Sequence, residues 1–186
     1  MNDEKLVLAL KEIDKILKGL NWIIISGLAV KIYADFNREV NDIDILIPKH
    51  NDFCEASKRF GKKIKKRFLE KENFTAKDYG FELSVKGVKV EVTGGMWEMN
   101  FGNLISKPKL DEEWVSHAQE KEFFGLKLKL QPLEDLIVQK IVMNRKKDKK
   151  DLENLLTKLE EVDMDFLKKD AESWNCLEKV ISTIKT

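Results

Sequence analysis

The sequence predicts an α+β protein in which helices flank a mixed β-sheet and a helical extension follows. Apolar, β-branched segments bounded by turn residues recur in the first two thirds of the chain, as in buried strands. After Pro132 only helix-like periodicity remains. We therefore predict an α/β core over residues 1–130 and a helical segment packed on it over residues 131–186. The strand-like segments are 22–25, 42–47, 79–85, 88–93, 114–123 and 126–130.

Helices are expected between these strands and at the C-terminal end. Apolar residues at intervals of three and four predict a helix over 4–18, which Gly19 would end, and another over about 51–68. A third would follow the strand at 22–25, with Ser26 as a candidate N-cap. Residues 96–112 look irregular. The last three predicted helices cover 133–141, 148–159 and 172–184.

Composition excludes several functional classes. Charged residues make up 36% of the 186 residues, yet 34 Lys and Arg against 33 Asp and Glu leave a net charge of +1. Such a balance argues against bulk electrostatic adhesion to nucleic acid. Two distant cysteines and two histidines are too few for a disulfide framework or a Cys/His metal site. No long apolar run and no secretory leader are readable, so we expect a cytoplasmic protein without a membrane segment.

The segment Asp42-Ile43-Asp44 is the main candidate for chemistry. Side chains alternate between the faces of a strand, so the two aspartates share one face. A divalent cation would relieve the repulsion between them, and Mg²⁺ prefers such oxygen ligands. Val88, Val90 and Val92 predict a strand whose other face carries Glu91. If the two strands are neighbours, Glu91 joins the aspartates; the alternative is an ordinary solvated face.

Ser26-Gly27 lies between a predicted strand and a predicted helix. A helix N-terminus presents free backbone N–H groups that bind phosphate, and glycine permits close approach. The hydroxyl of Ser26 would either cap the helix or contact a phosphate. A phosphate-binding turn followed by a carboxylate pair is what a metal–nucleoside triphosphate site requires.

In these segments the chain resembles the nucleotidyltransferase superfamily, which has the polymerase-β-like fold, in its minimal and abortive-infection-type forms. The turn is similar to the family's Gly-Gly or Gly-Ser turn, although here it reads Ser26-Gly27. Val40 and Glu91 stand where many members carry Thr and Asp. The resemblance covers residues 20–155. The matching segments are 25–30, 38–45, 89–92, 132–137, and Lys140 with Arg145–Asp151.

The resemblance implies a Mg²⁺- or Mn²⁺-dependent enzyme that moves a nucleoside monophosphate from an NTP such as ATP onto a hydroxyl, releasing pyrophosphate. It implies that Asp42, Asp44 and Glu91 bind the metal and are catalytic, and that Ser26 and Gly27 hold the β- and γ-phosphates. Arg38 or Lys140 would neutralise phosphate charge. The acceptor would be a small molecule, a protein or RNA. The alternative is a non-catalytic nucleotide-binding or antitoxin-like module that works beside a partner protein.

Positive charge is concentrated in two segments. Residues 58–67 contain seven basic side chains in ten, and a second cluster covers residues 145–150. The first is either a solvated helix face above Phe60 and Ile64 or a patch for RNA or another polyanion. The remainder of the chain is therefore acidic, and it includes the three candidate carboxylates.

Overall fold

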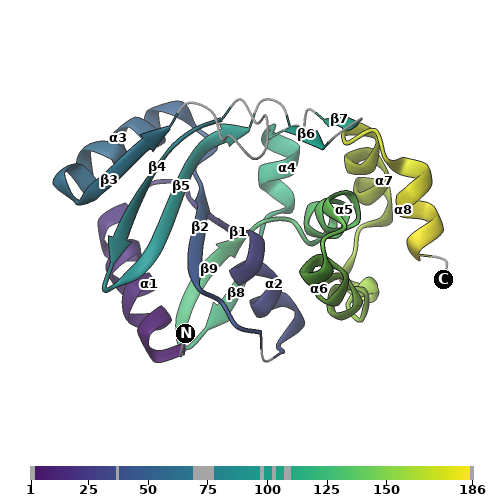
Figure 1. Ribbon diagram of the computed structural model, residues 1–186, viewed down its shortest axis with the longest axis horizontal. Coiled ribbons are helices and arrows are strands. Elements are labelled where there is room, and N and C mark those ends of the chain that lie inside the picture. The colour runs from purple at the N-terminus through teal and green to yellow at the C-terminus, as the bar shows by residue number, and fades with distance from the viewer. Residues whose placement is uncertain are drawn as a thin grey trace.

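The computed structural model describes residues 3–36, 38–68, 78–96, 99–101, 104–106 and 110–184 (Figure 1). The helices are α1 (Asp3–Leu17), α2 (Ser26–Ala34), α3 (His50–Phe60), α4 (Glu112–His117), α5 (Leu133–Met143), α6 (Lys146–Leu156), α7 (Met164–Ser173) and α8 (Leu177–Ile184). The strands are β1 (Ile23–Ile25), β2 (Asp42–Leu46), β3 (Ile64–Phe68), β4 (Asp78–Val85), β5 (Val88–Met96), β6 (Met99–Phe101), β7 (Leu104–Ser106), β8 (Gln119–Phe123) and β9 (Leu126–Leu130).

Within these ranges the main sheet has seven strands in the order β3-β4-β5-β2-β1-β9-β8. Strand β1 runs antiparallel to β2 and parallel to β9, and β2 runs parallel to β5. Hairpins join β4 to β5 and β8 to β9. Lys86 and Gly87 both have positive φ, which is the backbone of a two-residue hairpin turn. The sheet is therefore mixed, as the sequence predicts.

The two faces of the sheet differ. One face carries the aliphatic side chains of Ile43, Ile45, Val90 and Val92, which are buried in the main core together with side chains from α1, α2 and α3. The opposite face is apolar only near its middle, where α4 and α7 cover β1 and the end of β2. Polar side chains occupy the rest of that face along β2, β4 and β5. One face of the sheet is thus buried in the hydrophobic core, and the other is only partly covered and carries polar side chains.

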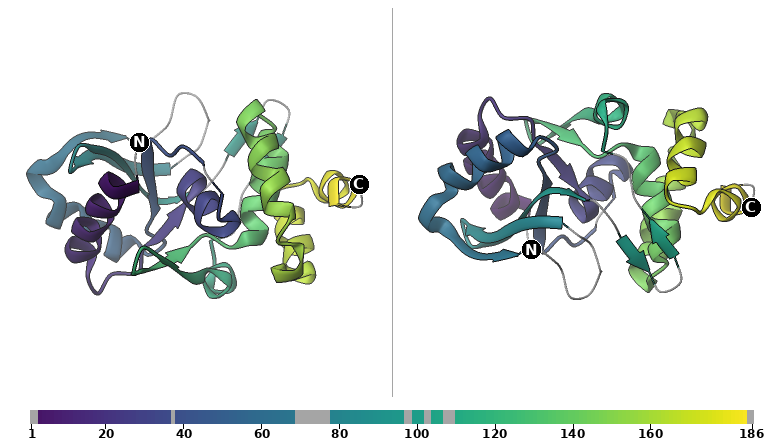
Figure 2. Two further views of the ribbon diagram at one scale, coloured as in Figure 1. Left: turned by 90° about the horizontal axis from the view of Figure 1, so that it is seen from below. Right: turned by 90° about the horizontal axis from the view of Figure 1, so that it is seen from above.

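The C-terminal helices lie together at one side of the sheet, away from α1 and α3 (Figure 1). Figure 2 shows α8 at the end of the molecule, farthest from the sheet. Buried residues of α5, α6 and α7 nevertheless belong to the same hydrophobic cluster as the sheet, as Leu136, Leu155 and Leu167 show. Helices α5 and α6 contact α2, which packs beside β1 and β2.

Four local predictions were wrong. Residues 96–112, expected to be irregular, contain the antiparallel pair β6 and β7. The predicted helix over 51–68 ends at Phe60, because Gly61 adopts a positive φ of 47°, and residues 64–68 form the edge strand β3. The predicted strand over 114–123 begins as α4, whose first turn is capped by the side chain of Asp111. Helix α7 was not predicted, although Asp163 caps it in the same way.

Candidate active site

The three candidate carboxylates lie on the partly open face of the sheet. Asp44 of β2 is the direct partner of Glu91 in the parallel register, and Asp42 lies two residues earlier on the same face. On the other side of β5, Glu82 of β4 is paired with Glu91. The row Asp44–Glu91–Glu82 thus crosses three neighbouring strands, at a spacing of about 4.8 Å per strand. As expected, the strand that carries Glu91 lies next to the strand that carries Asp42 and Asp44.

Burial differs along this group. Asp42 is exposed, Asp44 is half-buried and Glu91 is only 8% exposed. Lys89, the register partner of Asp42, extends toward Glu82, with Nζ 3.7 Å from Oε1. Carboxylates are rarely buried without a compensating positive charge. The placement of these carboxylates on adjacent strands concentrates negative charge at the surface of the sheet.

The chemistry of these donors fits a hard divalent cation. All are carboxylates, and Mg²⁺ takes oxygen ligands, usually one or two carboxylates together with water and substrate phosphates. Asp44 and Glu91 each already take part in another interaction. In the described parts of the chain no three His, Cys, Asp or Glu side chains are arranged to hold a metal ion as they stand. The strand register sets the three carboxylates on one face of the sheet.

Ser26 follows β1 directly and occupies an unusual backbone conformation. Its φ is +59°, in the left-handed region that costs a residue with a side chain about 1–2 kcal/mol. Its N–H donates to Oε1 of Gln131 at 3.0 Å. Ile25, not Ser26, precedes the helix as N-cap, and no side chain caps it, so the capping prediction for Ser26 was wrong. The strained turn is held from outside by Gln131.

Gly27 is in close contact with Arg38. A Cβ atom built on Gly27 would lie 2.5 Å from Nη1 and 3.2 Å from Cζ of Arg38. The guanidinium therefore rests on the backbone of the turn, in space that a side chain at position 27 would fill. An arginine in this position presents a delocalised positive charge beside the first N–H groups of α2.

Arg38 belongs to a buried ionic network with α5 and α6. Its Nε and Nη2 bind the two carboxylate oxygens of Asp151 at 2.6 and 3.0 Å. Lys140 Nζ lies 3.1 Å from Asp151 and 3.2 Å from Asp148, and its side chain is 3% exposed. Arg145 completes the network by binding Asp148. Asp151 thus joins the two cations that were predicted to neutralise phosphate.

Burial alone would raise the pKa of Asp148. Hydrogen bonds from Arg145 and the charges of Lys140 and Arg145 outweigh it and hold the pKa of that carboxyl below its usual range. The side chain of Asp148 is fully buried, so its negative charge depends on these two cations. The network therefore connects the loop that carries Arg38 to the C-terminal helices through ion pairs.

Sequence reasoning missed Gln131, Glu82 and the two aspartates of the network. The alternation of β4 could have placed Glu82 on the polar face once its register with β5 was known. Gln131 lies just after β9, and the contact with Ser26 joins residues 105 positions apart, for which the sequence carries no signal. Asp148 and Asp151 lie in a segment of this chain that resembles the family, but their ion-pair partners depend on how α5 and α6 pack.

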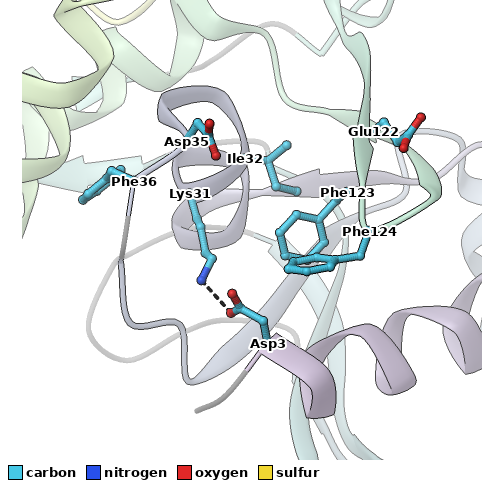
Figure 3. Close-up of a pocket in the computed structure, with 8 residues that line it drawn as sticks. All are labelled: Asp3, Lys31, Ile32, Asp35, Phe36, Glu122, Phe123 and Phe124. Carbon is cyan, nitrogen blue, oxygen red and sulfur yellow. Dashed lines mark hydrogen bonds and ion pairs between the residues drawn. The ribbon is translucent and has the colours of Figure 1, made fainter.

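A separate pocket of about 440 Å³ lies at the other end of α2 (Figure 3). Lys31 and Asp35 line it from the C-terminal half of α2 and the residue after it, and Phe123 and Phe124 line it from the end of β8. Lys31 Nζ lies 2.6 Å from Asp3 across this pocket. None of the candidate site residues lines it, because Ser26 and Gly27 lie at the opposite end of the helix.

The basic segment 58–67 extends over the end of α3, a short 3-10 turn and β3. Several of its cations bind the protein itself. Arg59 donates to Glu55 and to the carbonyl oxygens of Ile16 and Lys18, and Lys63 donates to Glu12. The segment is therefore not a single solvated helix face; polyanion binding by its exposed lysines stays a prediction.

Comparison with known proteins identifies the family. A family model described as "Nucleotidyltransferase of unknown function (DUF6036)" matches residues 4–183. No curated protein matches the chain. No helix of the described segments has the length and apolarity needed to cross a bilayer.

Solved structures share the fold. The Thermotoga maritima protein TM1012 has a TM-score of 0.63 at 21% identity, covering 85% of this chain and 96% of its own. ANT(2'')-Ia in complex with adenylyl-2''-tobramycin has a TM-score of 0.60 at 13% identity, covering 99% and 98%. The lincomycin-bound lincosamide adenylyltransferase LnuA has a TM-score of 0.50 at 14% identity, covering 83% and 96%. At these identities the structures establish the polymerase-β-like fold alone.

Proposed function

Because the chain belongs to the DUF6036 family of nucleotidyltransferases, we propose that it transfers a nucleoside monophosphate from an NTP to a hydroxyl group, with pyrophosphate as the leaving group. The observation that carries the proposal is the register of Asp44 against Glu91, with Asp42 on the same face of the sheet. Two further features support it, namely the strained Ser26 turn and the arginine held against Gly27.

Asp42, Asp44 and Glu91 are the proposed metal ligands and catalytic residues. Bound there, Mg²⁺ or Mn²⁺ would supply Lewis-acid stabilisation of an in-line displacement at the α-phosphate. The exposed Asp42 is accessible to a triphosphate, whereas Glu91, at 8% exposure, lies deeper. Glu91 is the acid that we propose to orient or deprotonate the attacking hydroxyl.

The Ser26 turn and Arg38 are the proposed phosphate site. The N–H groups of α2 that follow Ser26, beginning with that of Gly27, and the Ser26 hydroxyl would hold the β- and γ-phosphates. Arg38 would neutralise their charge, because its guanidinium already rests on Gly27. Lys140 shares Asp151 with Arg38, so it adds positive charge to the same network while orienting that arginine.

The acceptor is proposed to carry a hydroxyl, on a small molecule, a protein or RNA. One solved structure with this fold is a lincosamide antibiotic adenylyltransferase, and another is a complex with adenylyl-2''-tobramycin, which is in keeping with a small acceptor. A non-catalytic, antitoxin-like module is the second candidate. Retention of all three acids on one sheet face favours catalysis, since like charges placed together without a cation are unfavourable.

The test uses each α-labelled NTP with Mg²⁺ and cell extract as the source of acceptor. The wild-type protein should transfer label and release pyrophosphate. Asp42→Asn should lose roughly 100-fold or more of this activity with an unchanged melting temperature. The matched control is Asp165→Asn, whose exposed carboxylate lies on α7. Equal activity in the two variants would reject the catalytic assignment, and nucleotide binding without transfer would favour the non-catalytic module.

A further inference from the structure

Arg38 approaches the Ser26-Gly27 turn with a guanidinium group whose donors are used unequally. Nε donates to Oδ1 of Asp151 at 2.6 Å, and Nη2 donates to Oδ2 at 3.0 Å. The contact of Nη1 is weaker, since its acceptor, the carbonyl oxygen of Glu39, is 3.5 Å away. Nη1 is also the atom nearest to a Cβ built on Gly27, at 2.5 Å. The part of the guanidinium that Asp151 leaves open therefore lies against the backbone of the turn.

The two bonds to Asp151 form a bidentate pair. Such a pair fixes both the position and the plane of a guanidinium, whereas a single bond leaves the long arginine side chain free to rotate. The side chain of Asp151 is only 3% exposed, and the helix that carries it, α6, packs against α2. The carboxylate is thus held in place beside α2, and it binds the arginine through donors other than Nη1.

The ionic network around Asp151 contains one more cation than carboxylates. Lys140 Nζ lies 3.1 Å from Asp151 and 3.2 Å from Asp148, and Arg145 binds Asp148 as well. With Arg38, three cations therefore surround two carboxylates, which leaves one net positive charge among these five side chains. Because Lys140 already offsets part of the charge of Asp151, that carboxylate does not neutralise Arg38 completely. A triphosphate at the turn would meet a guanidinium that is both fixed and positive.

We propose that Asp151 is a positioning residue for nucleotide transfer, which holds Arg38 so that Nη1 binds a phosphate oxygen of the NTP at the Ser26-Gly27 turn. Asp151 does not contact the nucleotide in this role. The inference rests on the proposed function, because that function makes a triphosphate the ligand of the turn. It also makes the phosphate site depend on α6, through a residue 113 positions after Arg38 in the sequence.

Removal of the negative charge of Asp151 distinguishes positioning from simple electrostatics. By Coulomb attraction alone, Asp151→Asn should strengthen triphosphate binding, since a negative charge near the phosphates is lost. If Asp151 positions the arginine, the same substitution should weaken binding. An amide offers one acceptor oxygen in place of two, so Arg38 loses its bidentate partner. The direction of the change in the dissociation constant therefore separates the two effects.

The experiment measures the binding of a fluorescent NTP analogue, with Mg²⁺, to the full chain and to Arg38→Ala, Asp151→Asn and the double variant. We expect Arg38→Ala to weaken binding by about 10-fold or more and Asp151→Asn by about 5-fold. The double variant should bind no more weakly than Arg38→Ala alone, because Asp151 acts only through the arginine. The matched control is Glu55→Gln, which breaks the pair with Arg59 on α3 and should leave the affinity unchanged.

Chemical rescue gives a readout that a purely structural role of Asp151 would not change. In Arg38→Ala, Asp151 and Gly27 still border the space that the arginine side chain leaves, so a free guanidinium ion can pair with the carboxylate there. Added guanidinium should restore most of the lost NTP affinity of Arg38→Ala. Ammonium at the same concentration should not, because it lacks the planar fork. Guanidinium should not restore the affinity of the double variant.

A second substitution covers the case in which Asp151→Asn does not fold. Asp151→Glu keeps the buried negative charge but moves the carboxylate by one methylene group. It should weaken NTP binding by a few-fold when Arg38 is present and should have no effect in the Arg38→Ala background.

Unchanged or stronger NTP binding by Asp151→Asn would overturn the positioning role, and so would additive losses in the double variant. Equal rescue of the single and double variants by guanidinium would also overturn it, as would equal rescue by ammonium. Failure of the wild type to bind any NTP is a different result. It would reject the proposed function itself, and this inference with it.

Discussion

Asp44 of β2 and Glu91 of β5 are direct partners across two parallel strands. They lie 47 positions apart in the sequence, yet the register places both side chains on the partly open face of the sheet. One is half-buried and the other is 8% exposed, so their mutual repulsion is poorly screened. The folded chain therefore holds an arrangement that a divalent cation would stabilise.

Glu91→Gln should remove most of the stabilisation that Mg²⁺ provides. Ligands that bind only the folded state raise its stability, by about 2.7 kcal/mol at 100 times the dissociation constant. The wild type should therefore show a melting temperature that rises with Mg²⁺, and the variant a much smaller rise. Without Mg²⁺ the variant should be at least as stable as the wild type, because a buried charge is removed. Identical Mg²⁺ dependence in the two proteins would contradict the assignment of Glu91.

Gly27→Ala should weaken NTP binding by about 10-fold while leaving the fold intact. The new methyl group would displace the end of the Arg38 side chain, which is flexible enough to move. Binding of a fluorescent NTP analogue measures the effect. Arg38→Lys supplies the decisive comparison. If Gly27→Ala acts through Arg38, the two substitutions will be non-additive in a double-mutant cycle, whereas additive losses would show an independent effect.

Ser26→Gly and Ser26→Ala separate the hydroxyl from the backbone. Both remove the hydroxyl, but only glycine adopts φ near +59° without cost. We expect the glycine variant to exceed the alanine variant in free energy of unfolding by about 1 kcal/mol, measured in urea. Both should lose NTP affinity equally if the hydroxyl contacts phosphate. Wild-type affinity in both variants would leave phosphate binding to the backbone N–H groups alone.

Lys140→Met should destabilise the protein by about 3 kcal/mol. The substitution leaves Asp148 and Asp151, with side chains that are 0% and 3% exposed, without one of their cations. Urea unfolding at pH 7 measures the loss. The control is Lys168→Met, whose exposed pair with Asp165 should contribute less than about 1 kcal/mol. Similar losses in the two variants would contradict a structural role for the network.

Stability should also fall in acid through Asp148. Its pKa is held below the usual value of about 3.9, so the folded state favours the ionised form. This contribution is fully present above pH 4 to 5 and is lost as the pH falls through the lowered pKa of the folded state. Urea unfolding between pH 6 and pH 3 should show a steeper decline for the wild type than for Asp148→Asn. Parallel curves would contradict the lowered pKa.

The strands β2 and β5 and the polar face of Asp42, Asp44 and Glu91 could be predicted because alternation is a local property of a strand. Strand β1 was predicted from its short, wholly apolar run. Helix α1 was predicted for the same reason, since its apolar stripe is visible at helical spacing. By contrast β3 was missed, because a basic strand at a sheet edge has no buried face from which its period can be read.

The sequence by itself determined which residues are candidates for the active site. They are the carboxylates on two strands with alternating apolar side chains and the Ser26-Gly27 turn at the start of α2. Only the tertiary structure decided which of them meet. Strand register joined Asp44 to Glu91, and helix packing joined Arg38 to Asp151 and Gln131 to Ser26. Periodicity is encoded residue by residue, whereas long-range pairs depend on how whole elements bury their apolar surfaces against one another.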